Sequence, residues 1–323
     1  HCTFTNTKLG TVIIRKATAP GGGTGFAFSG DLGDFNLDDG GSETISNVAP
    51  GSYSVTEADP SGSGYELSGL TCVDSDATGQ PSAGDVASRT AAINVDPGET
   101  VTCTFTNTED DTITVEKVTI PASTDSFGFG GTLGNFDVAG GSVKDFLNVS
   151  PGSYTISEDD PSAAGYVLTG IACVDSATGQ TFPGNLSTRS VDLNLVAGET
   201  VHCTFTNTKL GTVIIRKATA PGGGTGFAFS GDLGDFTLDD AGSETINNVA
   251  PGSYSVIEAD PSGSGYELSG LTCVDSDQGG TASSGDVASR TAAINVDPGE
   301  TVTCTFTNTE DDTITVEKVT IPA

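Results

Sequence analysis

The stretch VTCTFTNT at residues 101–108 alternates strictly between two kinds of side chain. Its odd-numbered residues are Val, Cys, Phe and Asn, and all its even-numbered residues are Thr. Successive side chains of a β-strand point to opposite faces, so this pattern predicts a strand with one buried and one solvated face. The same stretch returns, nearly unchanged, at 201–208 and 302–309. This strand therefore ends a unit that the chain repeats.

Two repeats of different strength surround this strand. Residues 1–122 reappear at 202–323 with nine substitutions, four of them scattered and five within 77–83. A weaker repeat relates GSYSVTEADPSGSGYELSGLTCVDSD at 51–76 to GSYTISEDDPSAAGYVLTGIACVDSA at 152–177. The unit is about 100 residues long, which suits one small domain with its own core. Two versions alternate, which we call A-type and B-type.

The repeats predict three complete domains and two partial ones. We expect an A-type domain at 11–108, a B-type domain at 112–208 and a second A-type domain at 212–309. Residues 1–8 match the last strand of a preceding B-type domain. Residues 310–323 match a linker and the first strand of a following B-type domain. The chain is therefore expected to be part of a longer array.

The composition predicts an all-β fold. No stretch has helical periodicity, and short Thr, Val, Ile and Phe runs alternate with Gly, Pro, Asp and Ser clusters. About seven such strands per unit indicate a tandem array of Ig-like β-sandwich domains.

The seven cysteines follow the repeat, with one in the LTCVDS-type segment and one in the last strand of each unit. Two cysteines at matched places in each domain favour intradomain disulfides formed in an oxidising compartment. Buried free thiols are the alternative. The predicted pairs are Cys72–Cys103, Cys173–Cys203 and Cys273–Cys304, and Cys2 would pair outside this chain segment.

The net charge of −31 argues against binding to nucleic acids or anionic membranes. We expect no cofactor, because the sequence has no zinc spacing, phosphate loop or Ser/His/Asp set, and we therefore expect no enzyme acting on external substrates. Calcium is the one metal considered, although no defined calcium loop is present. Its candidate ligands are Asp31, Asp34, Asp38 and Asp39, for which solvated acidic loops are the alternative.

Three polar residues in each unit fall on the predicted buried faces of strands, where they need partners. A lysine lies in the first strand, a glutamate in a middle strand and an asparagine in the last strand. A buried Lys–Glu ion pair with a hydrogen-bonded Asn is one reading of this pattern. The residues are Lys16, Lys117, Lys217 and Lys318; Glu57, Glu158 and Glu258; Asn6, Asn107, Asn207 and Asn308.

The combination of TVIIRK at 11–16, the Tyr-x-Val-x-Glu run at 53–57 leading to Pro and Gly-Tyr, and CTFTNT at 103–108 resembles the collagen-adhesin B-type (Cna-B) repeat. These prealbumin-like (transthyretin-like) domains belong to bacterial surface proteins and pilins. The resemblance implies a spontaneous isopeptide bond between Lys and Asn, assisted by Glu57, Glu158 and Glu258. The implied pairs are Lys16–Asn107, Lys117–Asn207 and Lys217–Asn308, with Asn6 and Lys318 paired outside this segment.

These observations predict a structural role outside the cell or on its surface. The near-identical copies favour a fibre, stalk or matrix filament whose partners are further copies of the repeat and neighbouring chains. The alternative is an adhesin stalk or binding module that presents a ligand-binding head beyond this segment. Its candidate surface here is the variable loop at 77–83 and 278–284.

Overall fold

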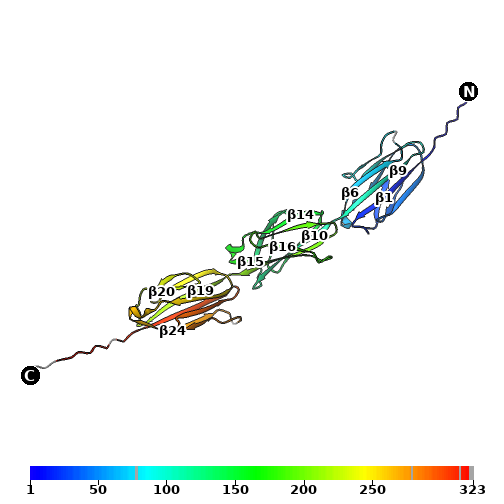
Figure 1. The fold of residues 1–323 in the computed structure, drawn as a ribbon. Coiled ribbons are helices and arrows are strands. Elements are labelled where there is room, and N and C mark those ends of the chain that lie inside the picture. The colour runs from blue at the N-terminus through cyan, green and yellow to red at the C-terminus, as the bar shows by residue number, and fades with distance from the viewer. Residues whose placement is uncertain (77–78, 278, 313, 320–323) are drawn as a thin grey trace, which may run out of the picture.

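The computed structural model describes residues 1–76, 79–277, 279–312 and 314–319, so parts of the variable loops lie outside the described residues. Three β-rich domains follow one another in an elongated array, with the two termini at opposite ends (Figure 1). The only helices among the described residues are three single-turn 3-10 helices. The predicted all-β fold is therefore confirmed.

The first domain has nine strands, two more than expected, because segments of three residues are too short to show periodicity. Its elements are β1 (Gly10–Ala19), β2 (Phe26–Gly30), β3 (Phe35–Leu37), β4 (Ser42–Val48), β5 (Gly51–Glu57), η1 (Ser61–Ser63), β6 (Tyr65–Asp74), β7 (Ala83–Asp85), β8 (Thr90–Val95) and β9 (Thr100–Glu109). They form two sheets, in the orders β4-β1-β9-β6 and β3-β2-β5-β8-β7.

The second domain joins its strands into one continuous nine-stranded sheet, in the order β12-β11-β14-β17-β16-β15-β18-β10-β13. Strand β16 pairs with both β15 and β17, and its buried Phe182 replaces Ser82 of the first domain. The elements are β10 (Asp111–Ile120), β11 (Ser126–Gly131), β12 (Phe136–Ala139), β13 (Val143–Val149), β14 (Gly152–Glu158), η2 (Pro161–Ala164), β15 (Tyr166–Asp175), β16 (Thr181–Asn185), β17 (Ser190–Leu195) and β18 (Thr200–Lys209).

The third domain repeats the two-sheet arrangement of the first, in the orders β22-β19-β27-β24 and β21-β20-β23-β26-β25. Its elements are β19 (Gly211–Ala220), β20 (Phe227–Gly231), β21 (Phe236–Leu238), β22 (Ser243–Val249), β23 (Gly252–Glu258), η3 (Pro261–Ser264), β24 (Tyr266–Asp275), β25 (Ser284–Asp286), β26 (Thr291–Val296) and β27 (Thr301–Glu310).

Each domain encloses one hydrophobic core between its two layers of strands. In the first domain Ile14 of β1 and Phe105 of β9 face Phe28 of β2 and Val55 of β5, and all four side chains are buried. The Phe28 and Phe105 rings meet edge to face, with centroids 5.1 Å apart. The alternation of buried and exposed residues along β9 follows the pattern from which the strand was predicted.

The first and last strands of each domain are parallel neighbours. Strand β1 pairs with β9 over nine residues, and β10 with β18 and β19 with β27 do the same. A chain that enters a domain along one strand and leaves along its parallel neighbour exits at the opposite end. This topology therefore strings the domains end to end along their strand direction (Figure 1).

The joints between domains are one residue long. Strand β9 ends at Glu109 and β10 begins at Asp111, while β18 ends at Lys209 and β19 begins at Gly211. The intervening residue is held in both cases, because its amide donates to a glycine carbonyl of the preceding domain at 2.9 Å. At the first joint, Ser150 Oγ also donates to Glu66 Oε2 across the domain boundary at 3.2 Å. Joints that are one residue long and held by hydrogen bonds to the neighbouring domain are stiffer than a flexible linker.

The two terminal segments have no strand partner. Residues 1–9 form no strand, and neither do the described residues of 311–319. The predicted strands would pair with residues of further domains, so they stay predictions; residues 313 and 320–323 lie outside the described part.

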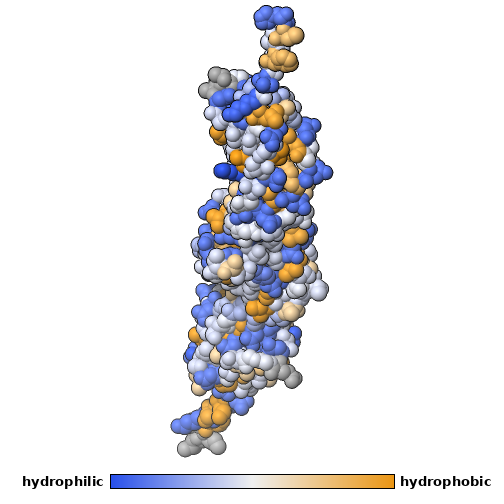
Figure 2. Space-filling view, turned by 90° about the vertical axis from the view of Figure 1, so that its right-hand side faces the viewer, coloured by the Kyte–Doolittle hydropathy of each residue, from blue (hydrophilic) through white to orange (hydrophobic). Residues whose placement is uncertain are grey.

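A second view of the array shows hydrophilic and hydrophobic residues interspersed on the visible face (Figure 2).

Candidate functional site

A buried Lys–Glu–Asn trio lies in the core of each domain. In the first domain β1 supplies Lys16, β5 supplies Glu57 and β9 supplies Asn107, and each residue is at most 2% exposed. Strand register brings the lysine and the asparagine together, because Lys16 pairs with Phe105 and Asn107 follows two positions later on the same buried face. The predicted inward positions therefore converge on one site.

One carboxylate oxygen bridges the other two groups. Glu57 Oε1 lies 3.3 Å from Lys16 Nζ and accepts a hydrogen bond of 2.8 Å from Asn107 Nδ2. The same two distances are 3.2 and 2.5 Å for Lys117, Glu158 and Asn207, and 3.3 and 2.9 Å for Lys217, Glu258 and Asn308. The amine and the carboxamide therefore contact the same oxygen in all three domains.

Aromatic rings and backbone carbonyls complete the surroundings of the amine. Lys117 Nζ lies 4.9 Å from the centre of the Phe127 ring and donates to the Phe205 carbonyl at 3.0 Å. In the first domain Lys16 Nζ lies 4.4 Å from the centre of the Phe26 ring. These neighbours offer the amine little of the solvation that water gives to a charge.

In the second and third domains, burial shifts the pKa values of both members of the ion pair toward their neutral forms. It lowers the pKa of Lys117 to about 8, against the opposing effect of Glu158, and it lowers the pKa of Lys16 and Lys217 as well. Burial likewise raises the pKa of Glu158 and Glu258, which their lysine and asparagine partners only partly oppose. The site therefore favours proton transfer from the ammonium to the carboxylate compared with water.

The amide oxygen of each asparagine has no hydrogen-bond partner. Asn107 Oδ1, Asn207 Oδ1 and Asn308 Oδ1 are all buried and unpaired, as is Glu57 Oε2. An unpaired buried acceptor is costly, so a native structure normally provides it with a donor. Each carboxamide of the trio therefore has a buried acceptor without a donor.

A disulfide lies on the same last strand. The structure joins Cys72 to Cys103, Cys173 to Cys203 and Cys273 to Cys304, in each case between directly opposite residues of two antiparallel strands. Cys2 is exposed and unpaired in its terminal segment. Asn6 and Lys318 are exposed in the terminal segments as well.

Three of the four acidic residues considered for calcium accept hydrogen bonds within the loops, and a calcium site at Asp31, Asp34, Asp38 and Asp39 stays a prediction. Asp39 accepts from the Thr18 and Gly22 amides, Asp38 from the Gly25 amide and Asp31 from Ser54. Among the described residues, the carboxylates that approach one another closely enough for a shared ion are elsewhere, in two equivalent sets of the A-type domains. These sets are Asp76, Asp96 and Glu99, and Asp277, Asp297 and Glu300. Ala177 and Val196 replace two of the three carboxylates in the B-type domain.

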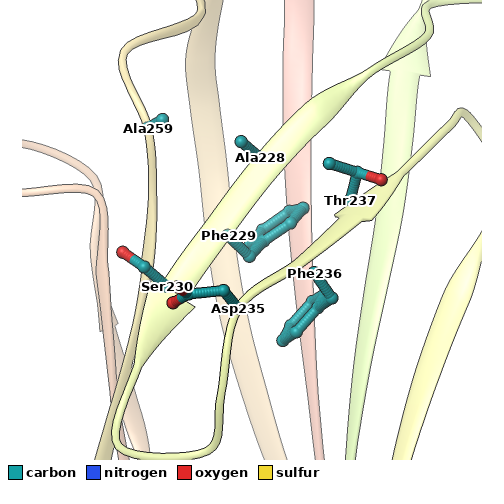
Figure 3. A pocket seen from close by; sticks show the side chains of 7 residues that line it. All are labelled: Ala228, Phe229, Ser230, Asp235, Phe236, Thr237 and Ala259. Atoms are coloured by element: carbon teal, nitrogen blue, oxygen red, sulfur yellow. The ribbon is translucent and has the colours of Figure 1, made fainter.

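The pocket in Figure 3 does not contain the trio. It lies between β20 and β21 of the third domain, with Ser230 and Asp235 as neighbouring polar side chains and Phe229 and Phe236 beside them (Figure 3). Its seven lining residues include no histidine, cysteine or lysine, so they offer no acid–base pair of the kind found in the trio.

Two site-related features were missed by the sequence analysis. The first is an arginine in each domain that accepts a hydrogen bond from the backbone amide of the trio's glutamate: Arg89, Arg189 and Arg290. The sequence could have indicated it, because this arginine is the only residue common to the A-type and B-type turns. Asp111 at the first joint is completely buried, with Oδ2 unpaired. The pair Asp110-Asp111 at the start of the B-type domain is visible in the sequence, but nothing in the sequence indicated that Asp111 is buried.

A family model described as a prealbumin-like fold domain matches residues 12–109, 113–209 and 213–310. The resemblance to prealbumin-like repeats is thus confirmed. No curated protein matches the chain. No helix in the described ranges is long and apolar enough to cross a membrane.

Solved structures of three proteins, two of them major pilins, are similar to the chain. The Bacillus anthracis TIE protein has 15% identity and a TM-score of 0.37, over 94% of this chain and 51% of that protein's chain, so this chain spans about half of it. BcpA, the major pilin subunit of Bacillus cereus, has 11% identity and a TM-score of 0.36, over 94% and 100%. The major pilin SpaD from Corynebacterium diphtheriae has 10% identity and a TM-score of 0.30, over 95% and 98%.

Proposed function

Because the chain belongs to the prealbumin-like fold domain family, we propose that it is a structural repeat segment of a long extracellular fibre, stalk or matrix filament. The observation that carries this proposal is the buried trio between two adjacent parallel strands, which are the first and last of the domain. We propose that each trio becomes an isopeptide bond, between Lys16 and Asn107, Lys117 and Asn207, and Lys217 and Asn308. Disulfides in every domain fit an oxidising, extracellular location.

The proposed reaction needs no external reagent. The lysine transfers a proton to the glutamate, and its neutral Nζ attacks the Cγ of the asparagine carboxamide. A bond forms between Nζ and Cγ, the bond between Cγ and Nδ2 breaks, and Nδ2 leaves as ammonia with protons shuttled by the glutamate. The fold holds the two groups against one carboxylate, which replaces an encounter in solution by a local step.

The unpaired asparagine oxygen supports this mechanism. The amide nitrogen and oxygen of an asparagine have nearly the same shape, so their assignment depends on the hydrogen bonds around them. Rotation of the Asn107 amide group by half a turn would exchange Nδ2 and Oδ1 and so place Oδ1 next to Glu57 Oε1. A protonated Glu57 then donates to Oδ1 and polarises the carbonyl that the amine attacks.

The bond would change how the array carries tension. Pulling on the chain ends loads the parallel pairing of β1 with β9, which lies directly between the points where force enters and leaves. A bond from Lys16 to Asn107 transmits that force covalently and shields the residues between them. The acidic surface would keep such arrays soluble, and further copies along the chain and neighbouring chains would be the partners.

Intact-mass measurement of the purified chain after reduction tests the covalent part of this proposal. We expect a mass lower than that of the sequence by one ammonia for each complete domain, whereas an unchanged mass would refute the bond. Electron microscopy of the native assembly tests the role. Long uniform fibres with a two-domain repeat support the filament, and short stalks that end in a different head would favour the adhesin alternative.

A further inference from the structure

An arginine holds the backbone of the trio's glutamate from outside the core. The Arg189 carbonyl accepts the Glu158 amide at 2.9 Å, and Arg189 Nε donates back to the Glu158 carbonyl at 3.3 Å. The end of the guanidinium group lies 4.0 Å from Asp160, two residues further along. Arg290 makes the same two bonds to Glu258, both within 3.3 Å. The arginine therefore contacts the segment that carries the glutamate at several points.

The backbone of this arginine has an unfavourable conformation. Its φ is 54° at Arg189, 55° at Arg89 and 57° at Arg290, in the left-handed region where glycine or asparagine is normally preferred. An arginine that persists at such a position in three domains indicates a use for its side chain.

The neighbouring turn residues give no reason for this choice. The turn reads DVASRT at 85–90 and 286–291 but NLSTRS at 185–190, and the arginine is the only residue that the two versions share. The A-type and B-type turns thus differ at every position except the one that contacts the glutamate.

We infer that Arg189 and its counterpart Arg290 are positioning residues for isopeptide formation, which fix the assisting glutamate between the lysine and the asparagine. In the first domain Arg89 Nε has no hydrogen-bond partner, and of the two backbone bonds only the one from the Glu57 amide to the Arg89 carbonyl is kept. This inference rests on the proposed function. The arginine touches none of the reacting atoms and acts through the glutamate backbone and through its positive charge.

The charge gives the arginine an effect that a purely structural residue would lack. Two groups contact the Glu158 carboxyl, Lys117 from β10 and Asn207 from β18, while Arg189 from the turn before β17 contacts the backbone of the same glutamate. Burial raises the pKa of Glu158, and the positive charge of Arg189 opposes this shift, after the larger opposing effects of Lys117 and Asn207. Since bond formation requires the pair to hold one proton between them, the arginine shifts the pH window of the reaction to lower values.

Cell-free synthesis of the whole chain under oxidising conditions tests this inference. Samples quenched in acid and digested at successive times give the amount of Lys117–Asn207 linked peptide by mass spectrometry. The first and third domains of the same molecule serve as internal references. The Cys173–Cys203 linked peptide reports folding of the second domain, so a slow bond is distinguished from a misfolded domain.

For Arg189→Gly, which the backbone accepts, we expect the bond to form about tenfold to a hundredfold more slowly in the second domain alone. Both limbs of its pH–rate profile should move to higher pH. Arg189→Lys keeps the charge but not the planar donor, so it should slow the reaction and leave the limbs in place. Asp160→Asn, which removes only the surface ion pair, should change neither.

An Arg189→Gly chain whose second domain links as fast as its first and third, with an unshifted profile, would overturn the inference. A slower reaction with unmoved limbs would reduce the arginine to a structural contact and overturn it as well. Absence of linked peptide from all three wild-type domains would refute the proposed bond itself, which is a separate result.

Discussion

Lys117 lies two register positions before Asn207 on the neighbouring parallel strand, and both side chains point into the same core. Such an arrangement requires that the first and last strands of a domain lie side by side. An antiparallel pairing would reverse the direction of exit and bring both ends of the domain to one side. The candidate bond and the elongated array thus have one topological origin.

Replacing Glu158 by Gln should prevent isopeptide formation in the second domain only, because the amide cannot shuttle a proton. Without the tether, the domain should lose about 4–5 kcal/mol of stability on the chain-entropy model for a loop of this length. Mass spectrometry of linked peptides and urea unfolding measure the two effects. Glu116→Gln, which removes a partly exposed carboxylate of the same domain, is the control, and a linked Lys117–Asn207 peptide in the Glu158→Gln chain would contradict the mechanism.

Single-molecule pulling should show no domain extension in the wild-type chain. Asn207→Ala keeps the Lys117–Glu158 pair but removes the electrophile, so the second domain should open with a step of about 200 Å while its disulfide holds. Reduction should add about 100 Å, because the disulfide encloses a segment of 30 residues. Full-length extension steps in the oxidised wild-type chain would argue against a covalent clamp.

The disulfide should contribute measurably once the isopeptide bond is absent. In the Glu158→Gln chain, reduction of Cys173–Cys203 should lower the stability of the second domain by about 3–4 kcal/mol on the same model. Urea unfolding with and without reductant gives this difference. Equal urea midpoints with and without reductant would contradict this prediction, because β15 and β18 would then hold their register without the cross-link.

Asp111 should make the second domain less stable as the pH rises. Burial, with Glu199 and Asp110 nearby, raises its pKa to about 6, although the Glu199 amide opposes this shift. Because the folded state binds this proton more tightly than the unfolded state, the contribution of Asp111 to stability should be highest below about pH 4 and fall up to about pH 6, by on the order of 3 kcal/mol. Hydrogen-exchange measurements on residues 112–208 follow this change.

Asp111→Asn keeps the acceptor for the Glu199 amide and removes the charge. This variant should be more stable than wild type at neutral pH and should lack the descending part of the curve. The first and third domains, which have Gly10 and Gly211 at this position, should respond alike in both chains. Parallel pH curves for wild type and variant would contradict the assignment.

The sequence was sufficient to predict the longer strands and the inward position of the trio, for a physical reason. Strand periodicity alone decides which side of a sheet a residue faces, so Lys16, Glu57 and Asn107 could be assigned to the core without any contact being known. The positions of Arg189 and Asp111 could not be predicted in this way. Their environments depend on the geometry of a hairpin turn and on how two domains meet, and neither leaves a periodic signal.

The acidic loop residues show the opposite limit of sequence analysis. Asp38 and Asp39 look like ion ligands as a pair, yet each carboxylate accepts backbone amides of a neighbouring loop. Local side chain-to-backbone bonds of this kind are common for Asp in turns and give the same composition as a metal site. Composition alone therefore does not distinguish the two.

The single-residue joints have a consequence for how far such a molecule reaches. With no slack between one domain and the next, every additional unit moves the end of the chain outward by a fixed amount. The number of repeats encoded by the gene would then set the length of the molecule. Gain or loss of one A–B pair would change that length by a constant increment without altering any domain.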